Sequence, residues 1–124
     1  MKKVVIADDE PHVLRVLKLS LEREGYQVEG FPNAAKALIS IEQEHPDILI
    51  TDISMPVMTG EELCRHIQQE MPDRKFLIYV LTSRTEVEHR EWSREIDNLS
   101  FLEKPVSIRN LVNSLNAHFA GSGA

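Results

Sequence analysis

The sequence predicts a single α/β domain built on a parallel β-sheet with helices on both faces. Three observations support this prediction. Short apolar runs alternate with longer stretches in which apolar residues recur at helical spacing, and this alternation occurs five times in 124 residues. The first run, residues 4–7, is unbroken, which is typical of a strand buried on both faces. No internal repeat is present. The alternation itself predicts right-handed helical crossovers between parallel strands.

The first half of the chain contains two predicted strands and two predicted helices. Residues 4–7 form the first strand. Pro11 suits the first turn of a helix whose apolar positions recur until Gly25, a C-terminal stop signal. Residues 26–31 form the second strand, which is less apolar and therefore nearer an edge of the sheet. Asn33 then caps the second helix.

The second half repeats this pattern with one irregular segment. Its expected elements are a strand at 48–51, a loop at 53–60, a helix at 61–70, strands at 76–81 and 99–103, and a last helix from 108 to 119. Residues 84–97 are densely charged, so we expect their helix to be short, shifted or mobile. Trp92 stands among these charges. The segment is either a solvated face of opposite charges or a surface on which Trp92 anchors a partner or a dimer contact.

Composition narrows the class of protein. The chain is long enough for one domain, which we place at residues 1–120, with a flexible tail or linker start at 121–124. A net charge of -6 disfavours direct binding to nucleic acid, and the apolar stretches are too short to span a membrane. The single Cys64 cannot form an internal disulfide and suits a reducing cytoplasm. We therefore expect a cytoplasmic protein.

Polar residues follow four of the predicted strands. Asp8 and Asp9 follow the first, Asp52 the third, Thr82 the fourth and Lys104 the fifth. In an open parallel sheet, ligands bind outside the carboxyl ends of the strands, where strand order reverses. Three carboxylates, a hydroxyl and an ammonium at such an edge suit a phosphoryl group and a divalent cation. Without His or Cys, the set favours Mg²⁺.

Each of these residues also has an ordinary structural interpretation. Asp8, Asp9 and Glu10 could cap the first helix and complement its dipole. Asp52 could form a turn, and Lys104 could be a solvated charge. The joint arrangement at four strand ends favours a functional site over these separate explanations.

As a set, the motifs resemble the receiver domain of bacterial two-component response regulators. The resemblance covers nearly the whole chain and implies a flavodoxin-like, doubly wound five-stranded sheet of order 2-1-3-4-5. The matching residues are Asp8-Asp9, Asp52 with Met55-Pro56 and Gly60, Thr82 with Ser83, and Lys104-Pro105.

The resemblance implies a phosphorylation-dependent signalling switch. Asp52 would accept a phosphoryl group from a histidine kinase or a histidine phosphotransfer protein, and Lys104 and Thr82 would stabilise the transferring group. The chain would not be an enzyme for a separate substrate, because it would catalyse only its own phosphorylation and dephosphorylation. The implied Mg²⁺ ligands are Asp9, Asp52, the carbonyl of Ser54, and Asp8 through water.

A conformational switch is also implied. Thr82 would move toward the phosphoryl group and make room for Phe101 to rotate, although Phe101 could also be a simple core aromatic. The surface of the fourth helix, fifth strand and fifth helix would then change, and an output domain or a second copy could dock there. The Lys104-Pro105 bond would be cis, and Ser54 and Arg84 would set the phosphoryl lifetime.

Three other functions remain open. An unphosphorylated pseudo-receiver would keep the fold as an interaction module. A phosphatase of the haloacid dehalogenase type also uses a strand-end aspartate with Mg²⁺, but it would want an acid where this chain has Ser54. A flavodoxin would need a phosphate-cradling loop where Asp8, Asp9 and Glu10 stand.

Overall fold

The structure is a computed structural model that describes residues 1–83 and 91–122. Strands and helices alternate, and a 3-10 helix, η2, precedes the last strand. The elements are β1 (Lys3–Ala7), α1 (Pro11–Arg23), β2 (Gln27–Phe31), α2 (Ala34–Gln43), β3 (Ile48–Asp52), α3 (Gly60–Glu70), β4 (Leu77–Thr82), η2 (Glu91–Glu95), β5 (Leu99–Glu103) and α4 (Ile108–Ser122). α4 is the helix that the sequence predicts as the last of the chain.

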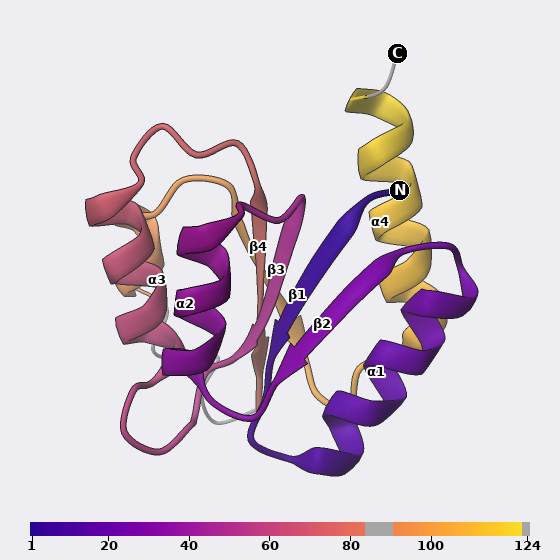
Figure 1. Cartoon of the computed structure of the whole chain (residues 1–124), viewed down its shortest axis with the longest axis horizontal. Helices are drawn as coiled ribbons and strands as arrows, with labels where there is room; N and C mark the ends of the chain where they lie inside the picture. Colours follow the sequence, from indigo (N-terminus) through magenta and orange to yellow (C-terminus); the bar gives the residue numbers. More distant parts are fainter. Residues whose placement is uncertain (84–90, 123–124) are drawn as a thin grey trace.

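The five strands form one parallel sheet in the order β2-β1-β3-β4-β5. This confirms the predicted flavodoxin-like fold class. Figure 1 shows the sheet between two pairs of helices, with α2 and α3 on one side and α1 and α4 on the other. Strand order reverses between β1 and β3, because β2 lies outside β1 while β3 lies on its other side. Their carboxyl ends therefore flank the expected ligand position.

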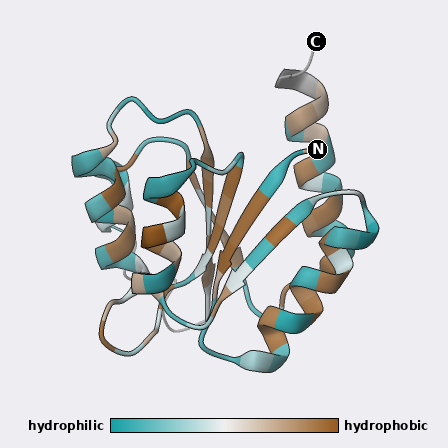
Figure 2. Cartoon of the chain, viewed as in Figure 1, coloured by the Kyte–Doolittle hydropathy of each residue, from teal (hydrophilic) through white to brown (hydrophobic). Residues whose placement is uncertain are grey.

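Each face of the sheet has its own buried core. Alternate strand residues point to opposite faces, so Val5 and Leu49 face α2 and α3, while Ile6 and Ile50 face α1 and α4. All four are fully buried. In Figure 2 the hydrophobic colour is concentrated on the inner strands and on the helix sides toward the sheet. Burial on both faces explains the unbroken apolar runs of the sequence.

Local signals position the helix ends as the sequence predicts. Pro11 begins α1, and Gly25 has a φ of 94°, a left-handed conformation that glycine adopts without a steric penalty. The Asn33 side chain accepts a hydrogen bond from the backbone N–H of Lys36 and so caps α2. α3 begins with a capping box between Thr59 and Glu62.

The last helix ends close to the predicted boundary between domain and tail. α4 continues to Ser122, past residue 120, while residues 123–124 lie outside the described part. The division into a domain and a tail stays a prediction. Within residues 1–83 and 91–122, no helix has the length and apolar character needed to cross a membrane.

Of the two interpretations of the charged segment, the one in which Trp92 anchors a partner at the surface is wrong. Trp92 lies in η2, is 8% exposed, and belongs to the core between the sheet and helices α2 and α3. Its ring centroid lies 5.8 Å from that of Phe101, with the rings at 79°. Ile96 is buried with it. The charged sequence therefore contains two side chains, Trp92 and Ile96, that pack in the core. Residues 84–90 lie outside the described part.

Truncation of Trp92 to alanine should therefore destabilise the fold. We expect the free energy of unfolding to fall by about 3–5 kcal/mol, the usual range for deletion of a buried aromatic. Urea denaturation of the parent and the variant measures this difference. Leu19→Ala is a matched control, because Leu19 lies on α1 with 48% of its surface exposed. A loss at Trp92 no larger than the loss at Leu19 would contradict the buried position.

Candidate functional site

Four neighbouring strands deliver polar side chains to one edge of the sheet. Asp8 directly follows β1, Asp52 and Thr82 are the last residues of β3 and β4, and Lys104 directly follows β5. Asp8 and Thr82 have no exposed surface, and Asp52 is 4% exposed. The strand order thus brings together side chains that lie up to 96 residues apart in the sequence.

The Lys104 ammonium is shared among three carboxylates. Its Nζ lies 3.3 Å from Asp52 Oδ2, 3.5 Å from Asp8 Oδ2 and 3.2 Å from Glu10 Oε1. The Lys104 side chain is 21% exposed, so its charge acts where solvent screening is reduced. The lysine holds together acids that would otherwise repel one another.

The backbone of Lys104 is hydrogen-bonded to the end of the neighbouring strand. The Lys104 N–H donates to the Thr82 carbonyl at 2.7 Å, which ties the ends of β4 and β5 together. The Lys104-Pro105 peptide bond is cis, the form that the resemblance implies.

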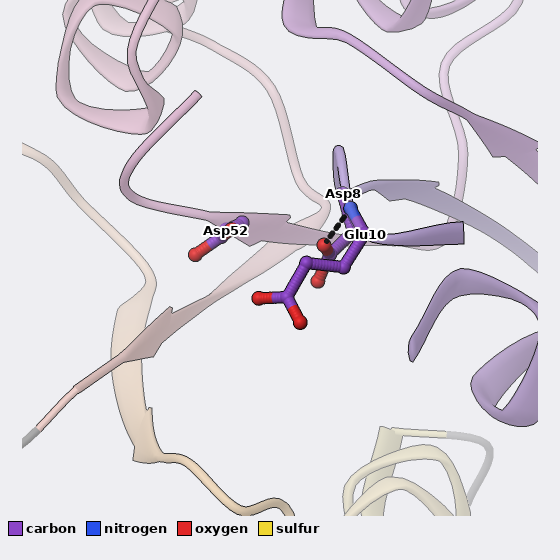
Figure 3. Close-up of side chains that lie close together, drawn as sticks. All are labelled: Asp8, Glu10 and Asp52. Atoms are coloured by element: carbon purple, nitrogen blue, oxygen red, sulfur yellow. Dashed lines mark hydrogen bonds between the residues drawn. The ribbon is translucent and has the colours of Figure 1, made fainter. Parts of the chain in front are cut away.

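The acid cluster differs from the expected ligand set in one residue. Among the described acidic side chains, those that gather into a group with oxygens within 4.8 Å of one another are Asp8, Glu10 and Asp52 (Figure 3). Asp9, predicted as a direct metal ligand, is exposed and is not in this group. The metal ligand set stays a prediction, with Asp8 and Asp52 brought together and Asp9 turned toward solvent.

Glu10 is the site residue that the sequence interpretation missed. Its backbone is the N-cap of α1, but its side chain makes no capping hydrogen bond. The Glu10 N–H donates instead to Asp8 Oδ1 at 2.9 Å, and this bond leaves Asp8 Oδ2 facing Lys104. The sequence signal was present as a third acid directly after Asp8 and Asp9, but helix capping explained it equally well.

Two buried polar atoms of the site lack hydrogen-bond partners among the described residues. They are Asp8 Oδ2, which has the ion pair with Lys104, and Thr82 Oγ1. A buried polar group without a partner typically costs about 1–3 kcal/mol. A carboxylate oxygen suits a divalent cation and a hydroxyl suits a phosphoryl oxygen, so both atoms fit a ligand that carries these groups.

The electrostatics of the site follow from burial. Burial, followed by the charge of Asp8, raises the pKa of Asp52 from 3.8 to about 6, although Lys104 opposes this change. Burial likewise raises the pKa of Asp8. Burial alone would lower the pKa of Lys104, but the charges of Asp52 and Asp8 raise it overall. The carboxylates are therefore ionised at neutral pH only against a free-energy penalty, which an added cation would relieve.

The loop after Asp52 approaches the strand end closely. The Gly60 N–H donates to the Ile53 carbonyl at 2.8 Å. A Cβ at Gly60 would lie 2.2 Å from the Asp52 carbonyl oxygen, so this position requires glycine. Met55 is buried and anchors the loop, while Val57 is 98% exposed with a φ of 72°, an unusual backbone conformation for a β-branched residue.

The structure places two of the three remaining predicted site residues, Phe101 and Ser54. Phe101 lies on β5 opposite Val80 of β4, and its ring contacts that of Trp92. The residue is half-buried. Ser54 is exposed. Arg84 lies outside the described residues. Their predicted roles in switching and in phosphoryl lifetime stay predictions.

Comparison with known proteins places this chain in one family. A family model described as the response regulator receiver domain matches residues 4–116. The chain therefore belongs to the response regulator receiver domain family.

Individual relatives agree with this assignment. The chain is 35% identical over 115 residues to the response regulator receiver protein CpdR of Brucella abortus, covering 93% of this chain and 94% of that protein. It is 31% identical over 110 residues to the alkaline phosphatase synthesis transcriptional regulatory protein PhoP of Bacillus subtilis, covering 89% of this chain and 45% of that protein. The chain thus spans less than half the length of this second relative.

A solved structure shows the same fold. The chemotaxis response regulator CheY4 of Vibrio cholerae superposes with a TM-score of 0.84 at 27% identity, covering 94% of this chain and 98% of that chain. These comparisons show that the chain is a response regulator receiver domain of two-component signalling.

The raised pKa of Asp52 predicts how stability depends on pH. The folded state binds this proton more tightly than the unfolded chain, so the contribution of Asp52 becomes unfavourable as pH rises from about 4 through 6. In the absence of divalent cations, Asp52→Asn should stabilise the fold at pH 8 by roughly 2–3 kcal/mol. This advantage should disappear near pH 4.

Urea denaturation with EDTA between pH 4 and pH 8 measures the effect. Asp73→Asn is the control, because Asp73 is an exposed aspartate in the turn between α3 and β4. A variant at Asp52 that is less stable than the parent at pH 8 would contradict the electrostatic account.

Proposed function

We propose that this chain is a phosphorylation-dependent signalling switch in which Asp52 accepts a phosphoryl group with the help of Mg²⁺. The supporting observation is the pair of buried carboxylates, Asp8 and Asp52, around the Lys104 ammonium at the carboxyl ends of the strands. Thr82 adds a buried hydroxyl without a hydrogen-bond partner among the described residues. Membership of the receiver domain family supports the same function.

The donor set suits Mg²⁺. This cation prefers oxygen ligands, keeps several waters and commonly joins one or two carboxylates to a phosphate. When bound, it would neutralise charge that develops on the phosphoryl oxygens. We expect the ligands to be Asp52, Asp9 and the carbonyl of Ser54, with Asp8 acting through water. The gathered oxygens of Asp8 and Asp52 support their part of this set.

Asp52 would act as the nucleophile. One of its carboxylate oxygens attacks phosphorus, and the bond between phosphorus and the donor's imidazole nitrogen breaks. The electron pair of that bond stays on the nitrogen, which takes up a proton, and Asp52 becomes an acyl phosphate. Lys104 then offers its ammonium to a phosphoryl oxygen, and Thr82 offers its hydroxyl to another.

The phosphoryl group would change the surface through Thr82 and Phe101. A Thr82 hydroxyl drawn toward the phosphoryl group vacates space beside the fifth strand, into which Phe101 can turn. Because the Phe101 ring contacts Trp92, this turn would also disturb η2. The altered surface would include η2, β5 and α4, where an output domain or a second copy of the chain could dock.

Partners and lifetime follow from the same proposal. The phosphoryl donor would be a histidine kinase or a histidine phosphotransfer protein. Ser54 and Arg84 lie two positions beyond Asp52 and Thr82, where we expect them to flank the path of the hydrolytic water. They would set the rate of dephosphorylation without abolishing phosphorylation.

Two of the alternative functions, the pseudo-receiver and the phosphatase, predict different chemistry. A pseudo-receiver would bind partners without gaining a phosphoryl group. A phosphatase would turn over small phosphomonoesters many times, whereas a receiver consumes a donor about stoichiometrically, apart from slow recycling. The absence of an acid at position 54 argues against the phosphatase.

Intact-mass spectrometry tests the proposed acceptor. Incubated with acetyl phosphate or phosphoramidate and Mg²⁺, the parent should gain one phosphoryl group, and Asp52→Asn should gain none. EDTA should suppress the gain in the parent, because the donor set needs a cation.

Asp73→Asn is again the control and should gain one phosphoryl group, because it removes an exposed aspartate elsewhere. A gain in both the parent and Asp52→Asn, or in neither, would overturn the assignment. Phosphate released from p-nitrophenyl phosphate in many turnovers would instead favour the phosphatase.

A further inference from the structure

Glu10 contacts the catalytic lysine without belonging to the expected site. It lies between the acid pair and Pro11, at the N-cap of α1. A glutamate there would normally use its side chain near the first helical N–H groups, but Glu10 makes no such bond. Its carboxylate instead accepts a hydrogen bond from Lys104 Nζ at 3.2 Å.

The three carboxylates around Lys104 differ in exposure. The side chain of Asp8 is fully buried and that of Asp52 is 6% exposed, whereas that of Glu10 is 60% exposed. Lys104 therefore sits between an inner pair of acids and one outer acid. Water can solvate the charge of the outer acid, Glu10, whether or not Lys104 is present.

Asp8 and Asp52 cannot bind the Lys104 ammonium and a divalent cation equally well at the same time. Asp52 Oδ2 and Asp8 Oδ2 lie within 3.5 Å of the ammonium, and these two carboxylates are also the buried pair that we expect around Mg²⁺. Like charges repel strongly at such separations in a partly buried site. A bound divalent cation would therefore push the ammonium toward Glu10.

We propose that Glu10 is a positioning residue for Lys104. It receives the ammonium while a cation occupies the inner carboxylates and releases it when a phosphoryl group arrives. This inference rests on the proposed function. Glu10 thus favours cation binding but competes with the phosphoryl group for the same lysine.

Two substitutions separate positioning from simple charge. Glu10→Gln removes the charge and the ion pair. Glu10→Asp keeps the charge but draws the carboxylate back by one methylene, too far to hold Lys104 at its present distance. Glu22→Gln is the matched control, because Glu22 lies on the same helix and its partner is Lys18, remote from the site.

The experiment measures two affinities in the intact chain. Calorimetry gives the Mg²⁺ affinity, and ¹⁹F NMR at saturating Mg²⁺ gives the affinity for beryllium fluoride, a phosphoryl mimic that attaches to a carboxylate. For Glu10→Gln we expect Mg²⁺ affinity to fall roughly three- to tenfold. Beryllium fluoride affinity should rise roughly two- to fivefold, the range of an exposed ion pair that no longer competes.

Glu10→Asp distinguishes positioning of Lys104 by Glu10 from an effect of the Glu10 charge alone. If Glu10 positions Lys104, Glu10→Asp raises beryllium fluoride affinity as Glu10→Gln does, while Glu22→Gln matches the parent. If Glu10→Asp matches the parent, Glu10 acts by charge alone and the proposal is wrong. A fall of both affinities in Glu10→Gln also overturns it, because Glu10 is then an outer ligand of the cation.

Failure of this inference is distinguishable from failure of the proposed function. A parent chain that binds neither Mg²⁺ nor beryllium fluoride contradicts the proposed function itself. A parent that binds both, with both Glu10 variants unchanged, contradicts the positioning role alone. Urea denaturation of each variant shows whether the fold is retained.

Discussion

The site depends on one interaction, the ion pair between the Lys104 ammonium and two buried carboxylates. Asp8 and Asp52 lie at the ends of adjacent strands, and their oxygens approach within 4.8 Å of each other with Lys104 Nζ beside both. Without a cation these charges would repel in a region that water reaches poorly. The lysine satisfies them only in part, since the pKa of Asp52 remains raised to about 6. In the function that we propose, this remaining repulsion favours binding of a further cation and, through it, of a phosphoryl group.

The fold explains why such a cluster can exist. Parallel strands buried on both faces end together at one edge, so polar residues placed after each strand meet regardless of their distance in the chain. The two apolar cores fix the strands, and Gly60 lies close to the Asp52 carbonyl, where the following loop begins. The hydrophobic packing of the sheet therefore stabilises a cluster of buried charges at this edge that would be unfavourable by itself. The proposed site therefore combines repulsion among its carboxylates with a fold that hydrophobic burial stabilises.

The sequence predicted the parts of the structure that depend on strong local signals. Unbroken apolar runs identified buried strands, and Asn33 and Gly25 marked helix ends, because burial and capping act over a few residues. Predictions were weaker where contacts between distant segments decide the outcome. Trp92 is surrounded by charges in the sequence yet packs on Phe101. Glu10 resembled a helix cap, but its side chain turns to a lysine 94 residues away, and no local pattern distinguishes these alternatives. Which of the neighbouring acids Asp8 and Asp9 turns inward was equally inaccessible, because it depends on the turn between β1 and α1.

If the buried carboxylates require a cation, cation binding and folding of this chain must be linked. The measurement is the urea midpoint of the parent and of Asp8→Asn/Asp52→Asn at pH 7.5, with and without saturating Mg²⁺. A ligand that binds only the folded state stabilises it, by about 2.7 kcal/mol at one hundred times its dissociation constant. We expect Mg²⁺ to raise the midpoint of the parent, whereas the doubly neutralised variant starts from a higher midpoint and does not respond. A parent midpoint that ignores Mg²⁺, or a variant that responds equally, would contradict the claim that these buried carboxylates require a cation.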